Sequence, residues 1–117
     1  MDRTEAIRAI REKSWVTYAR VAQLVDETDA TLIEHFIRAG RMGDGILTDP
    51  IESDPVAGPI IQKARDDAMQ TLKRERGGEH VWPPAVDELA QQILKNDHDI
   101  DWKTLQQMNP DIHFNYA

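Results

Sequence analysis

The stretch VTYARVAQLVDETDATLIEHFIRAGRM, residues 16–42, decides the fold of this chain. Thr17 is a residue type that caps helix N-termini, and apolar side chains then recur at helical spacing up to Val25. The polar run 26–29 predicts a turn. A second amphipathic helix follows and ends at Gly40, because glycine is favoured just past a helix C-terminus. The stretch therefore predicts two helices joined by a tight polar turn.

The flanking segments extend this pattern in both directions. Within the turn, Thr28 or Asp29 can cap the second helix. Towards the N-terminus, Thr4 is a candidate cap for a helix that runs to about Lys13. Towards the C-terminus, residues 43–59 are rich in glycine and proline, which predicts a loop or a short hairpin rather than a helix.

Two or three further helices are predicted after this loop. The first has Pro59 in its first turn and runs to about Arg76, where two glycines follow. A second begins at Pro84 and ends in the polar run 96–99. Residues 100–108 predict a last short helix, since apolar side chains recur at i, i+3 and i+6.

The predicted fold class is therefore all-α. Residues 1–42 form a helical unit that contains the helix-turn-helix-like pair, and residues 43–59 form the glycine- and proline-rich loop. Residues 60–110 form a helical region that packs on the first unit, and residues 111–117 form a tail. A length of 117 residues fits one domain with a single modest core.

The amino-acid composition excludes several kinds of functional site and indicates where the protein is located. The chain has no cysteine, which excludes disulfides, thiolate zinc sites and a cysteine nucleophile. No apolar run approaches the ~20 residues that span a bilayer, and the charged N-terminus lacks the apolar stretch of a signal peptide. We therefore expect a cytoplasmic protein that does not associate with membranes.

The net charge of −7 is distributed unevenly along the chain. Residues 1–42 hold seven basic and seven acidic side chains, whereas residues 43–117 hold seven basic and fourteen acidic ones. Affinity for nucleic acid comes largely from neutralising phosphates with basic groups. The acidic second part therefore argues against a protein that coats DNA without regard to sequence.

Residues 16–42 resemble the helix-turn-helix of excisionase-like and MerR-type winged-helix proteins. The resemblance rests on the cap at Thr17, on the small Ala22 inside the first helix, and on the closing IRAGRM at residues 37–42. It covers about 27 of the 117 residues. The sequence departs from the family in a turn that is one residue longer and carries acids instead of glycine. The resemblance implies that residues 43–47 would correspond to a short remnant of the family's β-hairpin wing.

The resemblance implies a small DNA-binding or transcription-regulatory protein, with the second helix in the major groove. Its contact residues would be Thr17, Thr31, His35, Arg38 and Arg41. The two arginines suit phosphates, and Thr31 suits a base edge or a phosphate. The acidic Asp29 and Glu34 lie on the same helix and oppose close approach to the DNA backbone.

Catalytic and metal-binding patterns are weak in this sequence. The histidines are far apart and form no i, i+4 pair: His35, His80, His98 and His113. The run 96–101 lacks the glycine and terminal glutamate of a calcium loop, and no glycine-rich phosphate loop is present. We therefore predict no catalytic residue, no metal site and no cofactor, and the sequence favours a protein that is not an enzyme.

The tryptophans lead to an alternative hypothesis. Trp15, Trp82 and Trp102 each lie at a predicted joint between helices, where they are expected to fill the core. Alternatively, aromatic residues of the acidic C-terminal part dock a protein partner: Trp82, Trp102, Phe114 and Tyr116. Under this reading the chain is a non-catalytic accessory subunit of a larger complex. Across the two hypotheses, the expected partner is DNA, another protein or a second copy of the chain.

Overall fold

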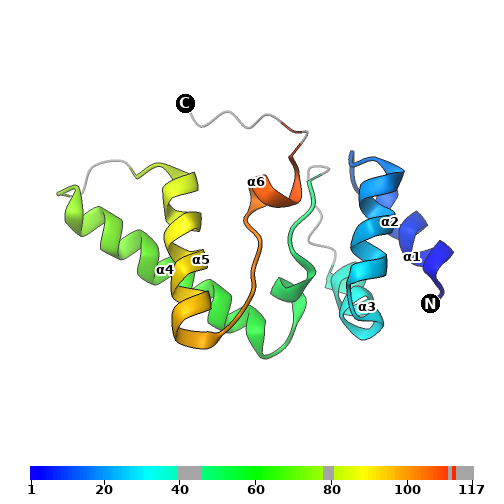
Figure 1. The fold of residues 1–117 in the computed structure, drawn as a ribbon, viewed down its shortest axis with the longest axis horizontal. Coiled ribbons are helices and arrows are strands. Elements are labelled where there is room, and N and C mark those ends of the chain that lie inside the picture. The colour runs from blue at the N-terminus through cyan, green and yellow to red at the C-terminus, as the bar shows by residue number, and fades with distance from the viewer. Residues whose placement is uncertain (40–45, 78–80, 111, 113–117) are drawn as a thin grey trace.

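The computed structural model describes residues 1–39, 46–77, 81–110 and 112, and these residues form helices without any β-strand (Figure 1). In chain order the helices are α1 (Arg3–Arg11), α2 (Tyr18–Glu27), α3 (Ala30–Ala39), the short 3-10 helix η1 (Pro50–Ser53), α4 (Ala57–Glu75), α5 (Pro83–His98) and α6 (Leu105–Met108). The all-α prediction is confirmed. The molecule is elongated, with principal extents of 49 × 31 × 19 Å.

The first three helices pack together, and we call residues 1–39 the three-helix unit. Each helix buries one apolar stripe in a common core that includes Ile10, Val21 and Phe36. Leu47 and Met108 complete this core from segments outside the unit. The three-helix unit therefore has a true interior, closed in part by residues far along the chain.

Side-chain caps start the helices of this unit. The Asp2 carboxylate accepts a hydrogen bond from the Glu5 N–H at 2.8 Å, and the Thr17 hydroxyl accepts one from the Arg20 N–H at 3.4 Å. The expected cap at Thr17 is confirmed. The expected cap at Thr4 is wrong, because Asp2 is the residue whose side chain reaches the amides of the first turn.

The turn between α2 and α3 is shorter than expected. Asp26 and Glu27 belong to α2, which leaves only Thr28 and Asp29 as the linker. Asp26 is held by Arg3, whose Nε and Nη2 donate to its carboxylate at 2.6 and 3.1 Å. This contact with α1 supports the last turn of α2. The Asp29 carboxylate then accepts from the first amides of α3, which confirms Asp29 as a cap.

The helices α4 and α5 form a helical hairpin around a second core. Its buried residues are Ile61, Ala64, Ala68, Val81, Val86, Ala90, Leu94 and Trp102. Helix α4 begins at Ala57, two residues before Pro59, because the Asp54 carboxylate accepts from the N–H groups of Val56 at 2.9 Å and Ala57 at 2.7 Å. Gly77 follows α4 with a φ of 65°, a conformation that glycine adopts without a steric penalty.

Residues 99–109, the return segment, run from the end of α5 back towards the three-helix unit (Figure 1). The predicted helix over residues 100–108 is wrong for its first half, since only Leu105–Met108 is helical. The preceding residues are extended because neighbours satisfy their backbone. The Lys103 N–H donates to Asp49 Oδ2 at 2.8 Å, and the Trp102 carbonyl accepts from Gln91 Nε2 at 2.8 Å.

The return segment joins the two cores. Trp102 is buried in the second core and Met108 in the first. Asn109 is 2 % exposed, and its side chain bonds both backbone groups of Leu47, accepting at 2.9 Å and donating at 2.7 Å. Arg20 of α2 also donates through Nη2 to the Met108 carbonyl at 3.1 Å. The return segment therefore lies between the three-helix unit and the helical hairpin and contacts both.

Candidate functional site

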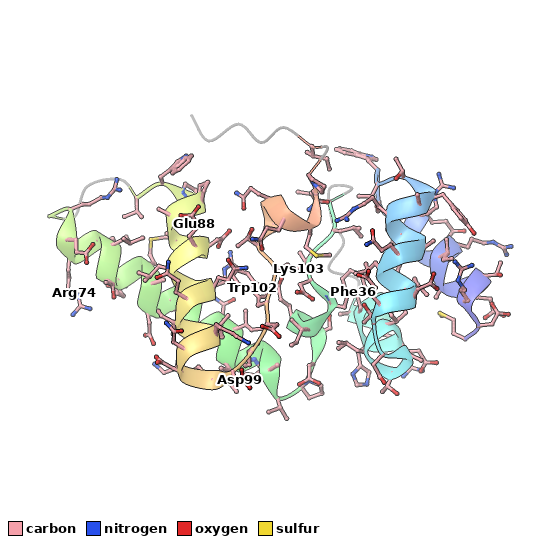
Figure 2. All side chains as sticks on the ribbon, viewed as in Figure 1. Phe36, Arg74, Glu88, Asp99, Trp102 and Lys103 are labelled. Atoms are coloured by element: carbon pink, nitrogen blue, oxygen red, sulfur yellow. The ribbon has the colours of Figure 1, made fainter. Side chains whose placement is uncertain are left out.

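The exposed face of α3 carries most of the residues predicted to contact DNA. Thr31, Glu34, His35 and Arg38 follow the i, i+3, i+4, i+7 spacing of one helix face, which we call the α3 face. Thr31 and Arg38 are exposed, whereas Glu34 and His35 are half-buried. The opposite side of α3 buries Phe36, labelled in Figure 2, in the first core. Packing therefore fixes which side of α3 faces outward.

Glu34 is flanked by positive charge. Its Oε1 lies 3.4 Å from the amino group of Met1, and its Oε2 lies 4.0 Å from Arg38 Nη2. The Arg38 side chain is 78 % exposed, so most of its guanidinium stays open to solvent. The negative charge of Glu34 is thus partly neutralised by Met1 and Arg38. Arg38 in turn has less positive charge to offer to a phosphate.

His35 faces a neighbouring acid. The charge of His35 contributes to a lowered pKa of Asp54, although the larger causes are the hydrogen bonds that Asp54 accepts from the amides of Ala57 and Val56. His35 therefore lies close enough to Asp54 for the two charges to interact. Of the predicted contact residues on α3, it is the least exposed.

The structure does not gather all five predicted DNA contacts. Thr31, His35 and Arg38 share the α3 face, but Thr17 lies at the other end of α2 from the linker. A ten-residue helix is about 15 Å long, so Thr17 is well separated from the first turn of α3. Arg41, the closing part of the IRAGRM motif and the first residues of the expected wing lie outside the described residues.

The three tryptophans have different environments. Trp102 is 4 % exposed, and its Nε1 donates to Glu52 Oε2 at 3.1 Å. The expectation of a core residue is confirmed for Trp102, and its role as a partner-docking side chain is wrong because the second core encloses it. Trp15 is 79 % exposed and Trp82 is 52 % exposed, so neither fills a core. Phe114 and Tyr116 lie outside the described residues.

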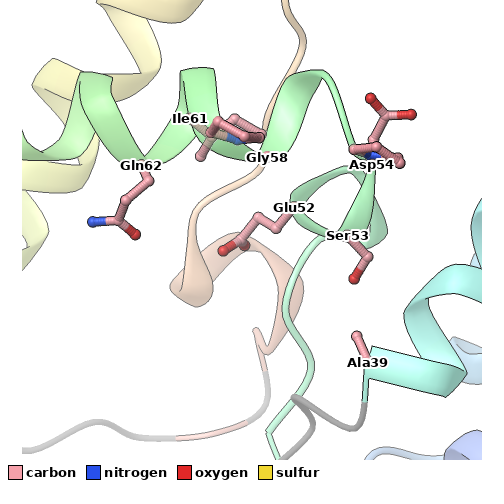
Figure 3. A pocket seen from close by; sticks show the side chains of 9 residues that line it. Ala39, Glu52, Ser53, Asp54, Gly58, Ile61 and Gln62 are labelled. Carbon is pink, nitrogen blue, oxygen red and sulfur yellow. The ribbon is translucent and has the colours of Figure 1, made fainter.

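A cleft of about 380 Å³ lies where the end of α3, η1 and the start of α4 meet (Figure 3). Glu52 lines it, and burial raises the pKa of the Glu52 carboxyl, while the hydrogen bond from Trp102 and the charge of Arg65 oppose this rise. Gly58 belongs to the same wall, where a Cβ would lie 2.7 Å from the Glu52 carbonyl oxygen. A glycine is therefore required for this close packing.

Arg65 lies beside two partly buried carboxylates. Its Nε is 3.6 Å from Asp87 Oδ1, and burial raises the pKa of Asp87 while Arg65 opposes the rise. The Arg65–Asp87 ion pair links α4 to α5, which is a structural role. Within the described ranges, no group of three or more histidine, aspartate or glutamate side chains is arranged to hold a metal ion.

Sequence reasoning missed a second surface, formed by α1 and the start of α2. Arg8, Arg11 and Lys13 are exposed there, as are Trp15 and Tyr18, which follow within the next five residues. The signal was present in the sequence, since basic residues spaced three apart on a helix precede two aromatic residues by only a few positions. The helical pattern alone did not show that these aromatic rings face solvent.

Comparisons of this chain with protein-family models, with curated proteins and with solved structures find no significant match. The resemblance of residues 16–42 to winged-helix proteins therefore stays a prediction. In the part of the chain that the structure describes, no helix is both long enough and apolar enough to cross a bilayer.

Proposed function

We propose that this protein is a small DNA-binding, transcription-regulatory protein that uses α2 and α3 as a helix-turn-helix. One observation carries the proposal. Two helices are joined by the two-residue linker Thr28–Asp29, the second is capped by Asp29, and the pair packs on α1 so that Thr31 and Arg38 face outward. This arrangement supports a recognition helix presented on a rigid base.

The charge of the α3 face favours selective rather than indiscriminate binding. Arg38 is exposed on this face and Arg41 follows three residues later in the sequence, so we assign the phosphate contacts to these two, while Asp29 is exposed and Glu34 is only partly compensated. With about two phosphate contacts, the logarithm of the binding constant should fall with the logarithm of salt concentration at a slope of about −2. Thr31 then supplies a contact to a base edge.

The test is a mobility-shift or fluorescence-anisotropy titration of the full chain against fragmented genomic DNA at ~50 mM salt, where phosphate contacts are strongest. Arg38→Ala should weaken binding and reduce the salt slope by about one. Arg74→Ala is the matched control, because Arg74 lies on α4 at the far end of the molecule (Figure 2) and is also exposed. Absence of binding at this salt concentration contradicts the proposal, as does an equal loss in both variants.

A second candidate is a non-catalytic accessory subunit. The observation that favours it is the 52 % exposure of Trp82 at the start of α5, on a surface that belongs to the acidic half of the chain. A partner that covers Trp82 should be retained by the wild-type chain in a pull-down and lost from Trp82→Ser, a residue that can still cap α5. An unchanged set of retained proteins contradicts this alternative.

A further inference from the structure

We propose that the second half of α1, the link that follows it and the start of α2 form a binding site for single-stranded nucleic acid. The site consists of Arg8, Arg11, Lys13, Trp15 and Tyr18, which we call the basic-aromatic surface. It is separate from the α3 face, and the inference does not require α3 to contact DNA.

Three residues of the basic-aromatic surface, Arg8, Arg11 and Tyr18, line a groove of about 420 Å³. One stripe of α1 supplies most of its lining, and Glu12 and Tyr18 close it; the stripe is Thr4, Ile7, Arg8 and Arg11. The Arg11 Cζ lies 5.8 Å from the centroid of the Tyr18 ring, within the range of a cation–π contact. This contact orients the aromatic ring beside a guanidinium group before any ligand arrives.

The aromatic rings of this surface are open to solvent. Trp15 is 79 % exposed and Tyr18 is 53 % exposed. Folding gains little from a tryptophan left in this position, since most of its apolar area remains hydrated. The Tyr18 ring beside Arg11 and the exposed Trp15 ring, three residues earlier in the chain, provide flat surfaces on which nucleobases stack. Stacking is tolerant of base identity because every base has a π-face.

The basic groups of this surface have their charge available. Arg8, Arg11 and Lys13 form no ion pair within the described residues, in contrast to Arg3, which is held by Asp26. Glu12 is the one acid between residues 8 and 18 of the sequence, so this segment carries a net positive charge in a chain whose total is −7. Phosphates are thus drawn to this end of the molecule rather than to the acidic hairpin.

Single-stranded nucleic acid can bind both the basic groups and the exposed aromatic rings of this surface. In a duplex the bases are stacked on each other and present only their edges, so exposed rings such as Trp15 gain no partner. An acidic peptide would pair with the arginines and Lys13, but its carboxylates make no use of the ring faces of Trp15 and Tyr18. A strand with unpaired bases places phosphates on the cations and bases on the rings.

Fluorescence anisotropy of the full chain tests this inference. The probe is a labelled oligothymidylate of ~20 nucleotides at ~50 mM salt, compared with a duplex of equal length and with a polyglutamate peptide. We expect the single strand to bind more tightly than either competitor. Trp15→Ser should weaken it about fivefold to a hundredfold, the range that corresponds to the loss of one stacked base.

Matched variants separate stacking from charge and from folding. Trp82→Ser removes an exposed tryptophan of the other unit and should leave oligothymidylate binding unchanged. Arg11→Gln should weaken binding and lower its salt dependence by about one in log–log slope. Circular dichroism of each variant checks that the helices persist.

Three outcomes would overturn the inference: no binding of oligothymidylate, binding that Trp15→Ser leaves unaltered, or preferential binding of duplex or polyglutamate through these residues. The DNA-binding proposal for α3 is tested independently. Arg38→Ala should leave single-strand binding intact, and Trp15→Ser should leave the binding of genomic duplex fragments intact. Each hypothesis can therefore fail without the other.

Discussion

The three-helix unit and the helical hairpin differ in how they bury apolar side chains and in how their helices begin. The three-helix unit surrounds a core of large residues such as Ile10 and Phe36, and its helices start at side-chain caps. The hairpin has only two helices, and alanines such as Ala68 and Ala90 occupy the line where they meet. Neither α4 nor α5 has a side-chain cap at the residue before its first turn.

The difference explains why the chain continues past α5. Two helices packed through small residues approach closely, but they leave one side of their interface uncovered. Trp102 of the return segment covers it, fixed by its hydrogen bond to Glu52. Six residues later Met108 enters the first core, so one short segment completes both interiors. The two units therefore depend on the same residues even though each has its own core.

The largest effect is expected from Trp102→Ala. Removing this buried indole should lower the free energy of unfolding by about 3–5 kcal/mol, because a large cavity opens in a core that contains few other large side chains. Urea denaturation followed by circular dichroism measures the loss. Trp82→Ala is the matched control, since Trp82 is half-exposed and should cost far less. Similar losses for the two variants would show that Trp102 is not the cover of the second core.

Asn109→Ala tests whether the return segment couples the two units. The substitution leaves both backbone groups of Leu47 without their partners in a buried position, which should cost about 3 kcal/mol. Unfolding should also become less cooperative, with a smaller dependence on denaturant concentration. Asn96→Ala, an exposed site on α5, is the control. A transition that keeps its slope and midpoint would contradict a coupling role for Asn109.

Glu52, which bonds Trp102 of the second core, gives the fold a pH dependence opposite in sign to that of Asp26 in the three-helix unit. Burial raises the pKa of the Glu52 carboxyl above its ordinary 4.5, so the folded state holds this proton more tightly than the unfolded state. The stability contributed by the proton is complete below about pH 4.5 and is lost as pH rises through the higher folded value. Glu52→Gln cannot ionise, and its amide oxygen can still accept from Trp102.

The free energy of unfolding of Glu52→Gln relative to wild type should therefore increase as pH rises from about 4 to 7. Chemical denaturation at several pH values measures this difference. The comparison with wild type removes the opposite contributions of Asp26 and Asp54, whose pKa values are lowered in the fold. Glu88→Gln controls for the loss of one negative charge on α5 (Figure 2). A difference that falls or stays constant with pH contradicts the sign derived for Glu52.

The smallest effect is expected in the three-helix unit, at the ion pair of Arg3 and Asp26. Hydrogen bonds from Arg3 are the main cause of the lowered pKa of Asp26, yet both groups are exposed. Solvent screens such pairs, so Arg3→Ala should lower the melting temperature only slightly. The difference from wild type should vanish in ~1 M salt. A difference that persists at high salt would show that Arg3 stabilises the unit through packing.

Local patterns allowed much of the helical structure to be predicted. Thr17 and Asp29 mark helix starts because capping involves only the next two or three amides, and a cap is readable from its own neighbourhood. The grouping of Thr31, His35 and Arg38 on one face followed from helical spacing alone. The sequence also identified the alternation of polar and apolar residues that makes α4 amphipathic.

The tertiary structure decided features that depend on residues far apart in sequence. Residues 100–104 have helical spacing but are extended, because Asp49 and Gln91 bind their backbone from other segments. The α3 face likewise gained its charge balance from Met1, more than thirty residues away along the chain.

The three tryptophans show most clearly that burial could not be predicted from sequence patterns. The sequence by itself determined that this chain forms amphipathic helices with an uneven charge, and it placed each tryptophan at a joint between helices. Only the tertiary structure determined that Trp102 is buried and that Trp15 and Trp82 are exposed. The physical reason is that capping and periodicity act over a few residues, whereas burial depends on which distant segment packs against a side chain.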